Sequence, residues 1–262
     1  MQAGSRATRL RCNKRYPGNE RQVGEEQMYA LHGERMLQAW ERGRECAEPW
    51  RALALLELAL PERGVESLGT LALAERNALL LELHALTFGP QLEAFAVCPE
   101  CGAQLEFVVN ARGLEASLQV PGEEAWMEHD TEMRIRPVNT CDLAAAVSAD
   151  DAVDPRTVLL QRTLSPWPVR GGDREVSGDW LERFERLNAS AEIRCVLPCS
   201  GCGERAVLDL DIALFLWREV TVAARRLLAE IHRLARAYGW SEQSIVAMSA
   251  ARRGTYLEML DA

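Results

Sequence analysis

Two short cysteine motifs carry the most specific chemistry in this sequence. They are Cys98-Pro99-Glu100-Cys101-Gly102 and Cys199-Ser200-Gly201-Cys202-Gly203. In such a knuckle a tight turn brings two sulfurs together, and the glycine after the second cysteine lets backbone N–H groups point at them. Two knuckles supply four thiolates at the corners of a tetrahedron, which is the closed geometry of a structural zinc site. The matched pair predicts a structural Zn²⁺ held by Cys98, Cys101, Cys199 and Cys202.

The two knuckles lie much further apart than in a simple zinc ribbon, where roughly 15–20 residues separate the pairs. We therefore expect residues 113–192 to form a subdomain inserted between the two hairpins of one ribbon. The entropy of closing a loop grows only slowly with its length, so an insertion of this size still allows the site to close.

Other chemistry of the cysteines stays open at this stage. A four-cysteine site also suits iron, as in a rubredoxin-type centre. A dithiol redox centre is the third reading, although no thioredoxin-like unit surrounds either pair. Cys195 could replace a ligand, but its place in an apolar alternation favours a packed core thiol. Cys12, Cys46 and Cys141 have no partner spacing and are interpreted as structural or incidental.

Catalytic motifs are not found elsewhere in the sequence. There is no glycine-rich phosphate loop, no H-E-x-x-H and no nucleophile elbow, and only four histidines are present. His129-Asp130 is the only pair in which a histidine precedes a carboxylate, and a solvated loop explains it as well as a catalytic dyad does. His84 lies in a leucine-rich segment and is expected to be a partly buried surface residue. The sequence therefore predicts a protein that is not an enzyme.

Strands are predicted on both sides of the knuckles, with helices beyond them. Apolar residues alternate at 105–109, at 193–197 and again at 208–212, which is typical of half-buried strands. Met133 and Ile135 indicate a further strand. Helical spacing or capping residues predict helices at about 35–44, 49–60, 74–87, 140–147, 155–164, 180–187 and 213–238, with two short helices after Ser241 and Ser249.

These elements predict an α+β fold built on a split four-cysteine zinc ribbon of small antiparallel hairpins. Helices are expected at the N-terminal and C-terminal ends, and the insertion is expected to be mainly helical. The expected parts are a flexible basic extension at 1–35, an N-terminal helical segment at 36–93, the split ribbon at 94–112 plus 193–212, the inserted α/β subdomain at 113–192 and a C-terminal helical segment at 213–262.

Composition limits the class of protein. The chain has 262 residues, of which 48% are hydrophobic and 26% charged, with a net charge of −9. This excludes a wholly disordered chain and a small disulfide scaffold. No apolar run is long enough to span a bilayer, and no secretory signal is recognisable, so a cytoplasmic protein without a membrane partner is expected. Residues 46–212 hold 28 acidic against 14 basic residues, which argues against nucleic acid and for a protein partner.

A further set of short motifs resembles a known family. Their order along the chain resembles that of the phage baseplate hub assembly chaperones of T-even-like contractile tails, whose relatives occur in contractile injection systems. The resemblance covers about residues 36–262. The motifs are Trp40 to Gly43, Arg76 to Leu80, Thr87 to Pro90, Cys141 to Leu143, Leu159 to Arg162, Tyr238 to Glu242 and Arg252 to Leu257.

The resemblance implies a non-enzymatic role in assembling, or forming part of, the baseplate of a contractile tail-like machine. Other baseplate or hub proteins would then be the partners, and the ribbon would be a rigid platform for docking helices. The expected partner contact is the C-terminal segment with Trp217, Tyr238, Trp240 and Tyr256, unless these rings pack the protein's own core. The alternative is a regulatory zinc-ribbon module that binds nucleic acid, for which Glu106, Asp209 and Asp211 are unfavourable.

Overall fold

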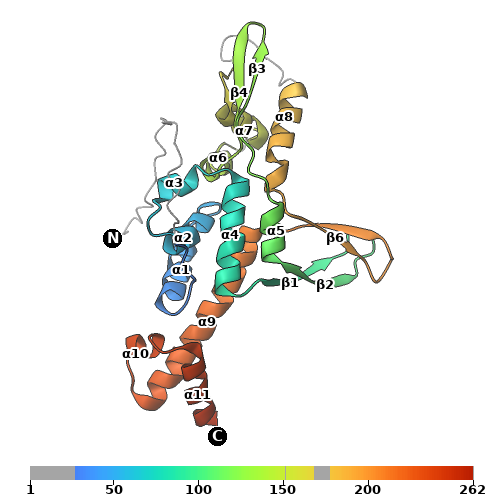
Figure 1. Ribbon diagram of the computed structural model, residues 1–262. Helices are drawn as coiled ribbons and strands as arrows, with labels where there is room; N and C mark the ends of the chain where they lie inside the picture. The colour runs from blue at the N-terminus through green and yellow to red at the C-terminus, as the bar shows by residue number, and fades with distance from the viewer. Residues whose placement is uncertain (1–26, 151, 168–177, 262) are drawn as a thin grey trace.

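The computed structural model describes residues 27–150, 152–167 and 178–261. It has the predicted α+β organisation (Figure 1), with a helical body and a wing of two small hairpins beside it. The first hairpin follows the C-terminal end of helix α4 (Leu73–Thr87), and an inserted unit lies beyond the N-terminal end of the same helix. Cys12 lies outside this description.

The helical body is held together by leucine-rich helices. It comprises α1 (Glu34–Glu45), α2 (Trp50–Ala59), α3 (Val65–Gly69), α4 (Leu73–Thr87) and the long α9 (Ile212–Tyr238). The buried face of α9 repeats every three or four residues, as an amphipathic helix requires. It consists of Ile212, Leu216, Val220, Ala224, Leu227, Ile231 and Leu234. The expected helices are confirmed, whereas the short α3 was not predicted.

The chain before α1 contributes to this core. Leu31 is completely buried, and the Tyr29 N–H donates to the Ala59 carbonyl at 2.9 Å. The expectation of a flexible extension over 1–35 is therefore wrong for residues 27–35, because an apolar side chain there fills space between helices. Residues 1–26 lie outside the described part of the chain.

The C-terminal segment folds back on the end of α9. Gly239 ends the helix with a φ of 69°, a left-handed conformation that glycine adopts without strain. The Ser241 side chain then caps α10 (Glu242–Val246), and α11 (Ala250–Asp261) packs against α9. Arg253 is almost buried and binds Glu230 of α9 at 2.9 Å, which fixes α11 in place.

The wing consists of two separate antiparallel hairpins that project from the helices (Figure 1). One pairs β1 (Gln91–Val97) with β2 (Gln104–Asn110), and the other pairs β6 (Arg194–Pro198) with β7 (Arg205–Asp209). The predicted split ribbon is thus present as backbone structure. The second hairpin ends earlier than expected, because Asp211 caps α9 by accepting from the Leu214 N–H at 3.0 Å.

The inserted unit combines a small sheet with helices. It contains β3 (Glu124–Glu128), β4 (Thr131–Ile135), α6 (Thr140–Val147), α7 (Pro155–Thr163), β5 (Leu164–Ser165) and α8 (Gly178–Asn188), followed by a 3-10 turn over Ala189–Ala191. The helix that leads into it, α5 (Ala111–Ser117), packs instead on α4 and the core of the body. The three strands form one antiparallel sheet in the order β3-β4-β5. Its small core includes Met133, Ile135, Leu164, Trp180 and Leu187.

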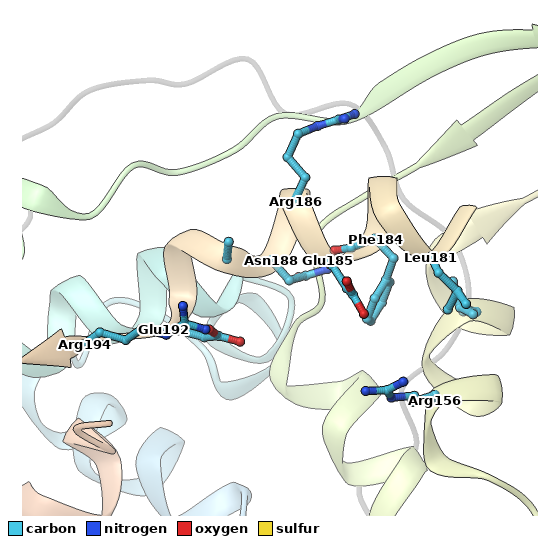
Figure 2. Close-up of a pocket in the computed structure, with 10 residues that line it drawn as sticks. Arg156, Leu181, Phe184, Glu185, Arg186, Asn188, Glu192 and Arg194 are labelled. Carbon is cyan, nitrogen blue, oxygen red and sulfur yellow. Dashed lines mark hydrogen bonds and ion pairs between the residues drawn. The ribbon is translucent and has the colours of Figure 1, made fainter. Parts of the chain in front are cut away.

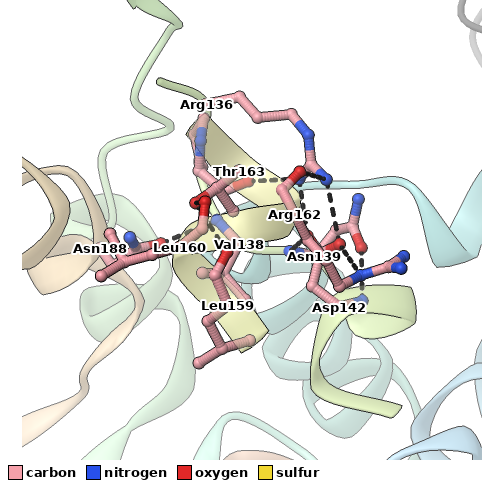
Figure 3. A network of polar contacts seen from close by, with 10 residues as sticks. Arg136, Val138, Asn139, Asp142, Leu159, Leu160, Arg162, Thr163 and Asn188 are labelled. Atoms are coloured by element: carbon pink, nitrogen blue, oxygen red, sulfur yellow. Dashed lines mark hydrogen bonds and ion pairs between the residues drawn. The ribbon is translucent and has the colours of Figure 1, made fainter. Parts of the chain in front are cut away.

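A buried carboxylate organises the junction between this sheet and α6 (Figure 3). Asp142 is fully buried and accepts from the Arg136 guanidinium at 2.6 and 3.0 Å and from Arg162 at 2.8 Å. Asp142 also accepts from the Asn139 backbone, while the Asn139 side chain accepts from the Asp142 N–H. Asn139 therefore caps α6 in a capping box, directly before the predicted helix start at residue 140.

Within the described residues, no helix combines the length and the apolar character that crossing a membrane requires.

Candidate metal centre

The four predicted ligands converge at the tips of the two hairpins. The Sγ atoms of Cys98, Cys101, Cys199 and Cys202 all lie within 4.8 Å of one another. Cys98 and Cys202 are 3.9 Å apart, and Cys101 and Cys199 are 3.6 Å apart. These distances are far longer than a disulfide bond of about 2.05 Å. They are close to the edge of about 3.8 Å expected for a tetrahedron of sulfurs about 2.3 Å from a zinc ion. The cluster can hold a metal ion.

Both knuckles have the same backbone hydrogen bonds. The Cys98 N–H donates to Ala103 at 2.9 Å, and the Cys199 N–H donates to Glu204 at 2.8 Å. The glycine that follows each second cysteine donates back to the first cysteine's carbonyl at 2.9 Å. Gly102 and Gly203 have φ values of 74° and 78°, which only glycine adopts freely. This explains why the sequence places glycine at both positions.

Close packing between the knuckles sets the spacing of the sulfurs. A Cβ atom added to Gly201 would lie 3.0 Å from the Ala103 Cβ and 3.4 Å from the Cys101 Sγ. Cys98 and Cys199 are buried in a small cluster with Leu105 and Ala206. Cys101 and Cys202 are exposed, so one side of the site faces solvent.

The protonation of the thiols depends on the neighbouring N–H groups and sulfurs. Hydrogen bonds from the Cys202 and Gly201 backbones lower the pKa of Cys199 to about 6. At Cys202, the backbone N–H of Glu204 favours the thiolate, but burial and the other three sulfurs raise the pKa to about 12. The pKa of Cys101 is likewise raised, despite a hydrogen bond from the Ala103 backbone, by Cys199 and burial. Four thiolates this close repel one another, and a cation removes that cost.

The remaining described cysteines lie apart from this cluster. Cys195 is buried on the inner face of β6, and burial raises its thiol pKa. It is a packed core thiol, as its alternation predicted, and it is not among the four converging sulfurs. Cys141 is buried in α6, and Cys46 is half-buried after α1.

The four aromatic residues predicted as a partner contact separate into two places. Trp217 lies within the helical body, where its ring packs against Gly43. The Arg51 guanidinium covers the ring, with its Cζ atom 4.8 Å from the ring centroid. Tyr238, Trp240 and Tyr256 form one cluster, in which Tyr238 and Trp240 stack at 4.5 Å and Tyr256 meets Trp240 edge-on at 4.8 Å. Trp240 and Tyr256 also pack on the main core, while Tyr238 is exposed.

Two histidines singled out in the sequence, His84 and His129, lie in different surroundings. His84 is fully buried, which corrects the expectation of a surface position, and its Nε2 lies 2.6 Å from the Glu219 carboxylate of α9. Phe88 and Phe215 flank its ring. His129 and Asp130 form the exposed turn between β3 and β4, with φ values of 45° and 61°. This geometry agrees with the solvated-loop reading.

A hollow of about 490 Å³ lies where α7, α8 and the start of β6 meet (Figure 2). Its lining mixes Leu160, Leu181 and Phe184 with three arginines and two glutamates. Two of the arginines are already paired, since Arg186 binds Glu124 at 2.8 Å and Arg194 binds Glu192. Among the described residues, this lining contains no histidine, cysteine or serine.

Two features of the site were not anticipated from the sequence. Gly201 and Ala103 allow the knuckles to touch, and the only signal for this is that both residues are small. The outer faces of the hairpins also expose apolar side chains, among them Phe95 of β1, which is 76% exposed. The alternation of apolar residues in the strand sequences showed which side chains could share a face of a hairpin. It did not show which face other parts of the protein would cover.

Comparisons with known proteins do not assign the chain to a family: no family model, curated protein or solved structure matches it.

Proposed function

We propose that this protein is a non-enzymatic structural or assembly component of the baseplate of a phage-tail-like contractile machine, with a structural zinc ion in its ribbon. The observation that carries the structural part of this proposal is the convergence of Cys98, Cys101, Cys199 and Cys202. The assembly role is supported by the sequence motifs that resemble baseplate hub assembly chaperones.

Zinc fits the donor set and the position of the site. Four cysteine sulfurs fill a tetrahedral shell, so no coordination position is left for a substrate or an activated water. The site joins two hairpins that come from distant parts of the sequence and that share only a few buried side chains. The metal would therefore act as a cross-link that holds the wing in one conformation.

A protein partner fits the surface better than nucleic acid does. The outer face of the first hairpin carries Glu93 and Glu106 and no basic side chain. Phosphate backbones are bound by arginine and lysine, so an acidic strand face repels them. The exposed Tyr238 ring and the adjoining Trp240 and Tyr256 support a docking contact at the C-terminal helices, where aromatic residues often anchor interfaces.

Elemental analysis of the purified protein tests the metal site. We expect one zinc per chain in the wild type and none in the Cys98→Ser/Cys101→Ser variant. Cys195→Ser is the matched control, because it removes a cysteine of the wing, on the second hairpin, without removing a candidate ligand, and it should retain the metal. Iron in place of zinc would give a coloured protein, and an absence of both metals would reject the site.

Co-expression tests the assembly role. If the genes beside this one encode sheath, tube and spike proteins, the tagged full-length chain should co-purify with one of these products. Trp240→Ala should weaken this capture while metal content stays unchanged. Tight, salt-sensitive binding of DNA in a filter assay, without any such capture, would instead favour the nucleic-acid module.

A further inference from the structure

Both outer faces of the wing expose apolar side chains. On the first hairpin, Phe95, Val97 and Val108 are 76%, 60% and 58% exposed. On the second hairpin, Val196 and Val207 are 48% and 55% exposed. The alternate residues point inward, where Leu105 of β2 and Ala206 of β7 share a buried cluster. The two apolar faces therefore lie on opposite sides of one two-layered wing.

Strand register gathers these residues into patches. Val196 lies directly opposite Val207 on the second hairpin. On the first hairpin Phe95 lies opposite Glu106, and Val108 lies opposite Glu93. Residues opposite or diagonal to each other on one face are in contact range. Each hairpin thus presents one apolar patch together with charged side chains.

The charges on the two faces differ in sign. The first face has the carboxylates of Glu93 and Glu106 and no cation. The second face has Arg194, Arg205 and Asp209. Arg194 is paired with Glu192 and lies 3.6 Å from Asp209. Arg205 is exposed and forms no ion pair with any residue that the structure describes, so it supplies a net positive charge beside the apolar patch.

We propose that these faces are the two halves of one contact between copies of this chain: the β1–β2 face of one copy packs on the β6–β7 face of the next. Two-stranded faces of similar width can stack as sheets do, with about 10 Å between them. Arg205 then meets the carboxylates of Glu93 and Glu106. This proposal goes beyond the assembly role and does not depend on it, because it requires only a folded wing.

The contact joins different faces, so it is heterologous. Each copy keeps one face free after pairing, and association continues into a ring or an open chain. A five-residue strand is only about 17 Å long, so each contact is small and belongs to the weak class of interfaces. Association should therefore depend on protein concentration and should weaken with salt, because it includes charge pairs.

Sedimentation velocity on the full metal-bound chain tests the proposal. Phe95→Glu disables the first face and Val207→Glu disables the second, and both residues are exposed enough for the fold to tolerate a charge. Wild type should form species larger than dimers as its concentration rises. Each variant alone should need at least about tenfold more protein to associate. An equal mixture of the two variants should form a heterodimer and nothing larger, because it contains one intact pair of faces.

Three further results decide the matter. Val222→Glu is the matched control, since Val222 is 69% exposed on α9 away from the wing, and it should associate like wild type. Arg205→Glu should weaken association. The proposal is overturned if wild type stays monomeric, or if either face variant alone forms dimers as readily as wild type. It is also overturned if Val222→Glu weakens association as much as the face variants do, or if Arg205→Glu leaves association unchanged. Metal content and circular dichroism confirm in each case that the variant is folded.

Discussion

The helical body and the wing achieve a fixed shape in different ways. Within the described residues, the body's core contains 26 buried apolar residues. Among them, the side chains of Leu53, Leu80 and Leu216 have no solvent exposure. The cluster between the hairpin tips contains four buried residues, and two of them are the candidate ligands Cys98 and Cys199. Burial of apolar surface stabilises the body, whereas the hairpin tips bury little of it, so under the proposed zinc site the tips would depend on the metal.

The difference predicts that the two regions can be unfolded separately. An isolated two-stranded hairpin is marginal in water. The bases of both hairpins join the main core through Leu92, Val109 and Ile193, but the tips do not. Loss of metal should therefore release the tips and leave the helices folded. Loss of a core leucine should weaken the body and leave the site intact.

Removal of the metal has the largest expected effect. Structural zinc contributes on the order of 10 kcal/mol to the folding of small zinc domains. In the Cys98→Ser/Cys101→Ser variant, hydrogen exchange should show that β2 and β7 lose protection while α4 and α9 keep theirs. Cys195→Ser should keep both regions protected. Equal loss of protection in the wing and in the helices would show that the two regions are one cooperative unit.

A cavity in the body is the next largest effect. Leu216→Ala should lower the free energy of unfolding by about 4 kcal/mol, because a fully buried leucine leaves a void among α9's neighbours. Denaturant unfolding measures this change. Leu214→Ala, at a half-buried position of the same helix, is the matched control and should cost less. Metal content should stay at the wild-type value in both variants, and its loss would contradict the independence of the wing.

The inserted unit is a third case, since it relies on a buried ion pair. Asp142→Asn should cost about 3 kcal/mol, because it removes the charge that two arginines bind. The arginine side chains are 22% and 33% exposed, so solvent partly replaces the lost partner. Asp154→Asn keeps a capping side chain on the exposed start of α7 and should cost less than 0.5 kcal/mol, roughly the effect of an ordinary surface change. Thermal unfolding compares the two.

The smallest expected change in stability comes from a glycine substitution in a knuckle, which separates the cost of backbone strain from the cost of a packing clash at the candidate metal site. Gly203→Ala introduces a Cβ at a φ of 78° but meets nothing within 4 Å, so its cost of about 1 kcal/mol is conformational. A competing chelator should extract its metal somewhat more readily. Gly254→Ala in α11 also meets nothing, has no positive φ and should be neutral or stabilising. If Gly203→Ala also proved neutral, the left-handed turn would not contribute to the metal site.

The four cysteines that converge could be identified from the sequence because the information for each knuckle is local. The Cys-x-x-Cys-Gly spacing specifies a knuckle whatever surrounds it, and a lone Cys195 in an apolar alternation specifies a core thiol. The long amphipathic pattern of α9 and the glycine that ends it are equally local. Expectations failed where distant segments decided the outcome: Leu31 is buried in the core of the helical body, and His84 is buried beside Phe215 and Glu219 of α9.

The sequence by itself determined the four candidate ligands, the α+β class and most helices and strands, because sulfur chemistry, periodicity and capping act over a few residues. Only the tertiary structure decided how closely the two knuckles pack, that Trp217 belongs to the body while Tyr238, Trp240 and Tyr256 cluster elsewhere, and which faces of the hairpins remain open. These outcomes depend on how separate elements pack, and packing depends on the shape and burial of residues that are far apart in the chain.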